Sequence, residues 1–320
     1  ERDRTTLNPS PPPMAASSTP VAILGPNRYG KGKVKLLRVY RHSGRHQVHE
    51  LEVSCLLTGD FESAFLNGTN EKILPTDTVK NTVLAFSKKV NVDPIEEYGL
   101  ALCKHFLDTQ KQVDAVDITL ERRAWDRLSD IRGVEHEHCF QGGSDVVCGA
   151  HVSQRRGEDA RVVSFVRDWR VMKTTNTGFV GFIKDPYTTL PEATDRIMCT
   201  KVLGEWTFCP KAVAKTGKDG VDFNAVRATV MRAFQEEFTG PAPGGVFSES
   251  VQKTLFDMGT RAIREVPSIT NVFLNMPNLH YFNVPLEKLG MENNMEVFYP
   301  AYEPHGVITA NVQRNPKARL

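Results

Sequence analysis

Apolar and polar residues alternate along several stretches of the chain in the pattern typical of half-buried strands. In the first half, this alternation predicts strands over residues 33–42, 46–59 and 113–125, with a return strand after the polar segment 135–145. In the second half, it predicts strands over residues 161–175, 202–209, 269–276 and 295–300, with a long loop over residues 176–194. Each half is therefore expected to contribute four strands.

Apolar residues at helical spacing predict two helices between the strands of each half. One helix is expected from Thr76 to about Asn91, with Thr76 as its N-cap. The next is expected to have Asp93 as its cap and Pro94 at its first helical position, and to end near Asp108. The apolar stripes of the second half are Phe223, Val226, Val230 and Phe234, then Val251, Leu255, Met258 and Ala262, with Ser248 or Ser250 as a cap.

The order strand–strand–helix–helix–strand–strand occurs twice and predicts an α+β fold of two antiparallel four-stranded sheets, each with helices on one face. The boundary between a first domain (28–155) and a second (156–312) is expected near residue 155. Residues 1–27, rich in Pro, Ser and Thr, are expected to form a disordered extension, and residues 313–320 a C-terminal tail. Four-stranded sheets leave open edges and one uncovered face, so we expect oligomerisation into a closed barrel.

The composition is that of an ordinary globular protein and excludes several function classes. The 320 residues carry a formal net charge of +2 with no basic stripe, which argues against nucleic-acid binding. No apolar segment approaches the ~18 residues of a membrane-spanning helix. The six cysteines are scattered without a C-x-x-C pair, so reduced thiols are expected. Glycine-rich phosphate loops, H-E-x-x-H and G-x-S-x-G are also absent from the sequence.

One cluster of potential metal ligands has to be considered: Glu135, His136, His138 and Cys139, with His151 as a possible fifth member. Their spacing fits no standard zinc pattern, and the segment is expected to be a loop. We therefore predict no metal site.

Two pairs of residues are candidates for a ligand site. Arg196 suits a planar anion because it offers two parallel N–H bonds, and Phe179 suits stacking on a ring. Asn278 and His280 occupy alternate positions of a strand, so both are expected on one face. The structural alternative is a core aromatic residue, a surface arginine and a satisfied histidine.

The remaining candidates are less specific when taken alone. Lys31 precedes the first strand and has the ordinary reading of a solvated lysine. Gln252 lies in the first turn of a helix, where its amide could contact a ligand or water. Thr76 and Asp77 crowd one helix start, where the simplest reading is that they satisfy free N–H groups and the helix dipole.

Taken together, these segments resemble the uricase (urate oxidase) family. The resemblance extends from about Arg28 to Val312 and rests on "RYGK", "TDTVKNT", "KTTNTGFVGFIKDPYTTLPEATDR", "SVQKTL", "PNLHYF" and "ENNMEVFYP". It implies two tandem T-fold domains, assembled as a homotetramer around a tunnel with sites between subunits. It also implies oxidation of urate by O₂ and water to 5-hydroxyisourate and hydrogen peroxide, with no cofactor and no metal.

The resemblance also implies a role for each candidate residue. Lys31, Thr76 and His280 would form a proton relay, with Thr76 and Asp77 coming from a neighbouring subunit. Asn278, with Thr76, would hold O₂ or water above the ring. The residues that would contact urate are Thr76, Asp77, Phe179, Arg196, the Val251 backbone N–H, Gln252 and Asn278.

The sequence departs from the family pattern at two positions. Leu279 stands where lysine is common, and is expected to point away from the face of Asn278 and His280. Pro186 stands where Glu is common and could shift the loop before Arg196. Two other functions remain open at this point: another purine- or pterin-binding T-fold enzyme, and a catalytically silent urate-binding relative.

The final residues, Ala318, Arg319 and Leu320, form a small–basic–leucine tripeptide. Such a tripeptide is similar to the Ser-Lys-Leu peroxisomal address, which predicts a peroxisomal location and an import receptor as a partner. A peroxide-forming activity fits that compartment.

Overall fold

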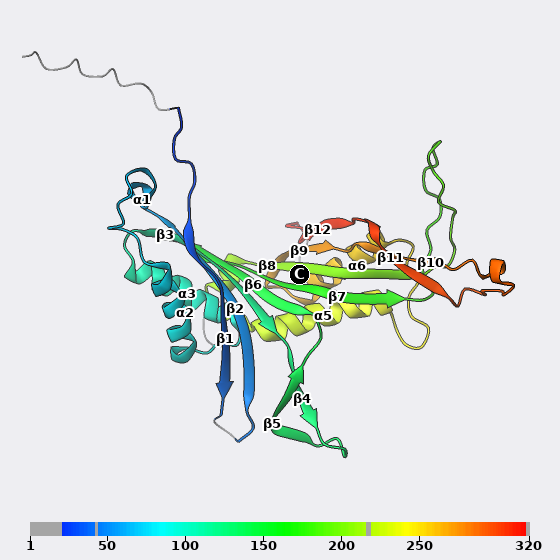
Figure 1. Cartoon of the computed structure of the whole chain (residues 1–320), viewed down its shortest axis with the longest axis horizontal. Coiled ribbons are helices and arrows are strands. Elements are labelled where there is room, and N and C mark those ends of the chain that lie inside the picture. Colours follow the sequence, from blue (N-terminus) through cyan, green and yellow to red (C-terminus); the bar gives the residue numbers. More distant parts are fainter. Residues whose placement is uncertain (1–20, 42–43, 216–218, 318–320) are drawn as a thin grey trace, which may run out of the picture.

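The structure, a computed structural model, describes residues 21–41, 44–215 and 219–317 (Figure 1). Its strands are β1 (Tyr29–Tyr40), β2 (Gln47–Gly59), β3 (Val113–Arg123), β4 (Trp125–Ser129), β5 (Glu135–Gly142), β6 (Val147–Arg155), β7 (Arg161–Lys173), β8 (Met198–Phe208), β9 (Ile269–Asn275), β10 (Asn278–Asn283), β11 (Phe298–Gly306) and β12 (Thr309–Gln313). Its helices are α1 (Glu62–Leu66), α2 (Thr76–Lys89), α3 (Ile95–Thr109), α4 (Pro210–Val213), α5 (Phe223–Thr239), α6 (Val251–Glu265) and the 3₁₀ helix η2 (Leu286–Leu289).

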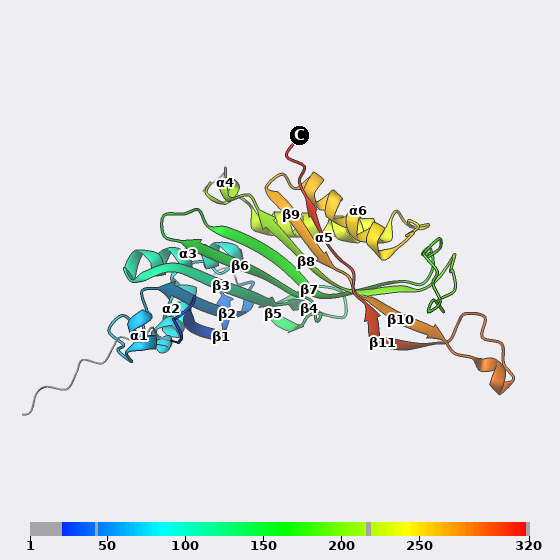
Figure 2. The ribbon, with the colours of Figure 1, turned by 90° about the horizontal axis from the view of Figure 1, so that it is seen from above.

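The main sheet is antiparallel and continuous through both halves of the chain. Its order is β1-β2-β3-β6-β7-β8-β10-β11, and β9 also pairs with β8 and carries β12 (Figure 2). The antiparallel α+β class is confirmed, but the two expected sheets are joined by the pairing of β6 with β7. The boundary predicted near residue 155 falls where β6 ends, and division into two domains there stays a prediction.

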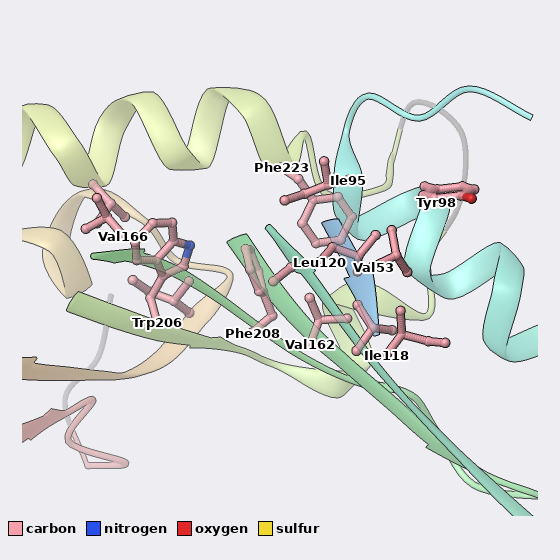
Figure 3. Close-up of a cluster of buried hydrophobic side chains, with 14 of the residues drawn as sticks. Val53, Ile95, Tyr98, Ile118, Leu120, Val162, Val166, Trp206, Phe208 and Phe223 are labelled. Atoms are coloured by element: carbon pink, nitrogen blue, oxygen red, sulfur yellow. The ribbon is translucent and has the colours of Figure 1, made fainter. Parts of the chain in front are cut away.

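The core lies between this sheet and the four long helices. In β3, the buried Val116, Ile118 and Leu120 alternate with polar residues, so one face of the strand is apolar. Trp206 and Phe208 of β8 belong to the same cluster, which therefore spans both halves of the chain (Figure 3). Helices α2 and α3 contact the first-half strands, and α6 contacts β9 and β12.

The other face of the sheet carries polar side chains. Asp117 and Thr119 of β3, His151 and Ser153 of β6 and Arg161 of β7 line a groove there, together with neighbouring residues of β2. Each of these strand residues alternates with a core residue. Within the described residues, no helical residue lines this groove, which agrees with the uncovered second face expected from the sequence.

Both predicted caps of the first-half helices are wrong. Helix α2 does begin at Thr76, but its N-cap is Pro75, which has the extended backbone of a cap and no side-chain donor or acceptor. Helix α3 begins at Ile95 with Pro94 as its N-cap. The carboxylate of Asp93 instead accepts a hydrogen bond from Arg122 Nη1 at 3.2 Å, a tertiary contact that competes with capping. Of the second-half candidates, Ser250 is the cap of α6.

The prediction of a loop at residues 135–139 is also wrong, because these residues belong to strand β5. This strand pairs with β4 in a separate two-stranded sheet that projects from the main sheet (Figure 1). Arg127 anchors it by donating from Nη1 to the carbonyl oxygens of His136 and Glu137 at 2.7 and 2.8 Å. In the described part of the chain, no group of three or more His, Cys, Asp or Glu side chains is placed to hold a metal ion.

All six cysteines are free thiols, as their spacing predicted. None of the helices in residues 21–41, 44–215 and 219–317 is long and apolar enough to cross a membrane.

Candidate active site

A cavity of about 200 Å³ lies where the loop before β8 meets β10. Four of the residues proposed from the sequence line it: Phe179, Arg196, Asn278 and His280. The rest of its wall is mostly apolar and includes Leu190, Pro191, Ile197, Phe282, Met295 and Phe298. An apolar wall with a few convergent polar groups is typical of a small-molecule site.

Phe179 is held in place because its loop folds back on itself. Its backbone N–H donates to the carbonyl oxygen of Ala193 at 2.7 Å, and the N–H of Ala193 donates in return at 3.1 Å. The Phe179 ring stacks on Phe182 with centroids 4.9 Å apart. The segment that the sequence predicted only as a long loop therefore presents an aromatic ring to the cavity with a fixed orientation.

Arg196 lies above that ring. Its guanidinium carbon is 5.2 Å from the Phe179 centroid, and its Nε is buried without a hydrogen-bond partner. In the described part of the chain, no carboxylate pairs with it. Burial alone lowers the pKa of the guanidinium from its ordinary value, although the group stays charged. A half-buried cation with unused donors is suited to bind an anion.

Strand β10 brings Asn278 and His280 to the same cavity. The intervening Leu279 is only 7% exposed and does not line the cavity, so it points away from them as the alternation predicted. Burial, and then the charges of Arg196 and His305, lower the pKa of His280 below its ordinary value of 6.5. The imidazole is therefore neutral near pH 7, with one nitrogen able to accept a proton and the other able to donate one.

Pro186 occupies an exposed turn that keeps its own hydrogen bonds. Asp185 accepts from the Tyr187 N–H at 2.9 Å and from the Thr188 hydroxyl at 2.8 Å, and these bonds lower the pKa of its carboxyl. The turn does not depend on an acidic residue at position 186. This departure from the family pattern is thus accommodated without displacing Arg196 from the cavity.

Val251 and Gln252 are at the start of α6 and do not line the cavity. Val251 is buried, and Gln252 is exposed. The helix start is nevertheless tied to the Phe179 loop, because the Gly178 N–H donates to the carbonyl oxygen of Ser248 at 3.0 Å. Val251 and Gln252 are therefore not part of the cavity wall. The helix start that carries them is linked to the cavity by this backbone hydrogen bond.

The other three proposed residues lie in the first half, at the start of β1 and of α2. Thr76 and Asp77 are exposed, and Lys31 is half-buried. Asp77 accepts hydrogen bonds from Lys80 and Asn81, and Lys80 lowers the pKa of its carboxyl, with a smaller contribution from Lys31. Strand β1, which contains Lys31, contacts helix α2.

The backbone around Lys31 is shaped by a neighbouring glycine. A Cβ atom at Gly30 would lie 2.0 Å from the carbonyl oxygen of Cys55, so no side chain fits there. Beyond Lys31 the register with β2 shifts, and Lys33 has a positive φ of 56°. The shift re-aims the start of β1 beside α2.

The candidate residues at the starts of β1 and α2 do not meet the cavity residues within one chain. The starts of β1 and α2 lie at one end of the molecule, and β10 with the loop before β8 lies at the other, in both views (Figures 1 and 2). Sequence reasoning also missed the apolar wall from Met295 and Phe298, and the aromatic Phe282. The available signal for Phe282 was its spacing, two residues after His280 on the same strand face.

These features define an α+β protein with a mostly apolar cavity in which an arginine without a carboxylate partner among the described residues lies over an aromatic ring. The uricase family profile matches residues 27–148 and 162–309. Uricases of Oryctolagus cuniculus and Danio rerio are each 37% identical over 292 residues, which cover 91% of this chain and 95% of each relative. The crystal structure of uricase from Arthrobacter globiformis matches with a TM-score of 0.83 at 35% identity, covering 93% of this chain and 97% of that chain.

The chain belongs to the uricase family. The T-fold implied by the resemblance of its motifs is confirmed by this match over nearly the whole chain.

Proposed function

We propose that the cavity binds urate and that the protein oxidises it with O₂ and water to 5-hydroxyisourate and hydrogen peroxide, without a metal or organic cofactor. Urate oxidation is the activity of the family to which the chain belongs, and the chain is accordingly an oxidoreductase. The observation that carries the proposal is the unpaired Arg196 guanidinium 5.2 Å above the Phe179 ring. A monoanionic purine has the negative charge that Arg196 can bind and the flat face on which Phe179 can stack.

In this proposal Arg196 and Gln252 bind the purine edges, and the backbone N–H of Val251 adds a contact. Phe179 stacks on the ring, and Asn278 holds O₂ or water above it. The apolar wall of the cavity excludes bulk water, which strengthens the polar contacts inside. The protein thus supplies orientation and charge stabilisation to a substrate that is itself readily oxidised.

Proton transfer is assigned to Lys31, Thr76 and His280. The Thr76 hydroxyl is a weak base alone, so Lys31 polarises it as it takes a proton from urate. His280, neutral near pH 7, passes protons to and from the oxygen species above the ring. Overall, the urate monoanion loses two electrons and one proton, and water adds its hydroxyl to the ring and gives up its own proton. O₂ takes the two electrons and both protons to become hydrogen peroxide.

The active unit is proposed to be a homotetramer around a tunnel, with each site shared between two subunits. Helix α2, whose first turn holds the exposed Thr76 and Asp77, begins at one end of the chain, whereas β10 and the loop before β8 lie at the other (Figure 1). In the assembly, a neighbouring subunit brings its Thr76 and Asp77 to the cavity and also covers the polar face of the sheet. One subunit alone then has no complete site.

Complementation between two inactive variants tests this arrangement. Thr76→Ala and His280→Ala tetramers are purified separately, dissociated, mixed and reassembled, and urate loss is followed by absorbance. If sites are shared, about a quarter of the sites in a random mixture combine an intact Thr76 with an intact His280, and turnover returns. Thr76→Ser is the matched control, since it keeps the hydroxyl and should stay active.

Failure of well-folded mixtures to recover would show that Thr76 of one subunit and His280 of another do not serve the same site. Dialysis against EDTA gives a second test. Activity should survive it, and loss of activity with rescue by one added metal would contradict the cofactor-free reaction.

Peroxisomal import through an import receptor is proposed from the C-terminal Ala-Arg-Leu. These residues, 318–320, lie outside the described residues. A fluorescent fusion that carries them should colocalise with a peroxisomal marker, and deletion of Leu320 should leave it diffuse. An unchanged pattern after deletion would contradict the proposal.

A further inference from the structure

Phe282 lies next to His280 on the same face of β10. The two rings are nearly parallel, at 19°, with centroids 5.7 Å apart. This distance is within the range of offset aromatic stacking, an arrangement that resists rotation of either ring. Phe282 is in turn supported by Tyr299, directly opposite it on β11, with centroids 5.6 Å apart.

Little else restrains the imidazole of His280. In the described part of the chain, neither of its ring nitrogens makes a hydrogen bond. Its cross-strand neighbour on β11 is Ala301, whose methyl group is too small to hold a ring. The nearby charged groups are Arg196, in the loop before β8, and His305, on β11, and both repel the protonated form rather than anchor it.

A proton-transfer group needs a defined direction toward the atom it serves. Hydrogen bonds from a second residue usually give a catalytic histidine that direction. In the described part of the chain, stacking on Phe282 is the contact that restrains the His280 ring. Phe282 also lines the cavity, so its ring and the imidazole of His280 border the same space.

We propose that Phe282 is a positioning residue for the reaction, which orients the His280 imidazole by stacking and does not itself bind urate. This inference rests on the proposed role of His280. Loss of the Phe282 ring should leave urate bound as before but misdirect the proton transfer. A positioning role for Phe282 therefore predicts a lower kcat with an unchanged KM. A residue that only contacts the substrate would instead change KM.

The test compares steady-state urate oxidation by Phe282→Leu, Phe282→Tyr and His280→Ala, each first shown to form the wild-type assembly. Phe282→Leu should lower kcat about 10- to 100-fold with KM within about twofold of wild type, because misdirected proton transfer forfeits much of acid–base catalysis. Phe282→Tyr keeps the ring and should restore kcat to within about threefold. Should Phe282→Leu not assemble, Phe282→Met, whose unbranched side chain adapts more readily to the space left by the ring, takes its place.

Phe65→Leu is the matched control, since Phe65 is 50% exposed and Phe282 is 48% exposed, and Phe65 lies in α1 outside the site. Wild-type kinetics in Phe282→Leu, a raised KM with unchanged kcat, or equal losses in the leucine and tyrosine variants would each overturn the inference. If His280→Ala keeps turnover, the proposed relay itself fails. If His280→Ala is inactive while Phe282→Leu is normal, only the positioning role fails.

Discussion

Arg196 and Arg227 are both withdrawn from water, but only Arg227 has a carboxylate partner. Arg227, on α5, donates from Nη2 to Glu96 Oε1 of α3 at 2.7 Å, and Ser164 of β7 donates to the same oxygen at 2.5 Å. Glu96 is 0% exposed and Arg227 is 5% exposed. Arg196 lies over the Phe179 ring and has no carboxylate partner among the described residues. Each arginine has a buried Nε without a partner.

The difference separates a structural charge from a binding charge. A buried ion is costly unless it is paired, so Glu96 and Arg227 compensate each other and link the helices of the two halves. Arg196 leaves this cost partly uncompensated, and the missing partner is the anion that the cavity is proposed to bind. An arginine without a carboxylate is therefore the more informative feature of the two.

The largest change in the free energy of unfolding should come from breaking the buried ion pair of Glu96 and Arg227. Arg227→Met leaves the Glu96 carboxylate buried without its cation, and should lower the free energy of unfolding by about 3–5 kcal/mol. Denaturant titration of the assembled protein measures this loss. The double variant Glu96→Gln/Arg227→Met removes both charges and should lose less than Arg227→Met alone. Wild-type stability in Arg227→Met would show that the pair is not structural.

Changing the unpaired arginine should instead affect function. Arg196→Lys keeps the charge but loses the two parallel N–H donors, and should weaken transition-state binding of urate by about 1.5–3 kcal/mol in kcat/KM. The free energy of unfolding should change by no more than about 0.5 kcal/mol, because no partner is left unpaired. Urate kinetics and denaturant titration of the same preparation measure both. Unchanged kcat and KM would remove Arg196 from the site.

The smallest effect concerns the titration of His280. Its pKa is lowered first by burial and then by the charges of Arg196 and His305, so Arg196→Gln should raise the pKa toward 6.5 without fully restoring it. Turnover that needs neutral His280 should then fall at a higher pH than in wild type. Two-dimensional NMR of the histidine ring protons measures the shift. Arg227→Met serves as the control and should leave the His280 titration unchanged.

The same group also contributes to stability, with a defined sign. Because the folded-state pKa of His280 is lowered, the unfolded chain binds the proton more readily. The contribution is present above pH 6.5 and is lost as pH falls through the lowered folded-state pKa. A contribution that grew on acidification would contradict the lowered value.

Local patterns predicted most helices and strands of the fold. The apolar stripes of α2, α3, α5 and α6 and the alternation in β2 and β3 reflect burial of one face, which sequence spacing records directly. The caps at Thr76 and Asp93 were wrong for a different reason. Pro75 already has the extended backbone of a cap, and Asp93 pairs with Arg122, 29 residues further along the chain. A cap prediction from local sequence alone does not include these backbone and tertiary contacts.

The sequence by itself determined the α+β class, the placement of Asn278 and His280 on one strand face, and the set of motifs that identify the family. These follow from spacing, and spacing is a property of the chain alone. Only the tertiary structure decided which arginine is paired. Glu96 and Arg227 are 131 residues apart, whereas folding brings Arg196 to an aromatic ring and, within residues 21–41, 44–215 and 219–317, to no carboxylate. Pairing of buried charges depends on three-dimensional proximity and on exclusion of water, and neither is written in the local order of residues.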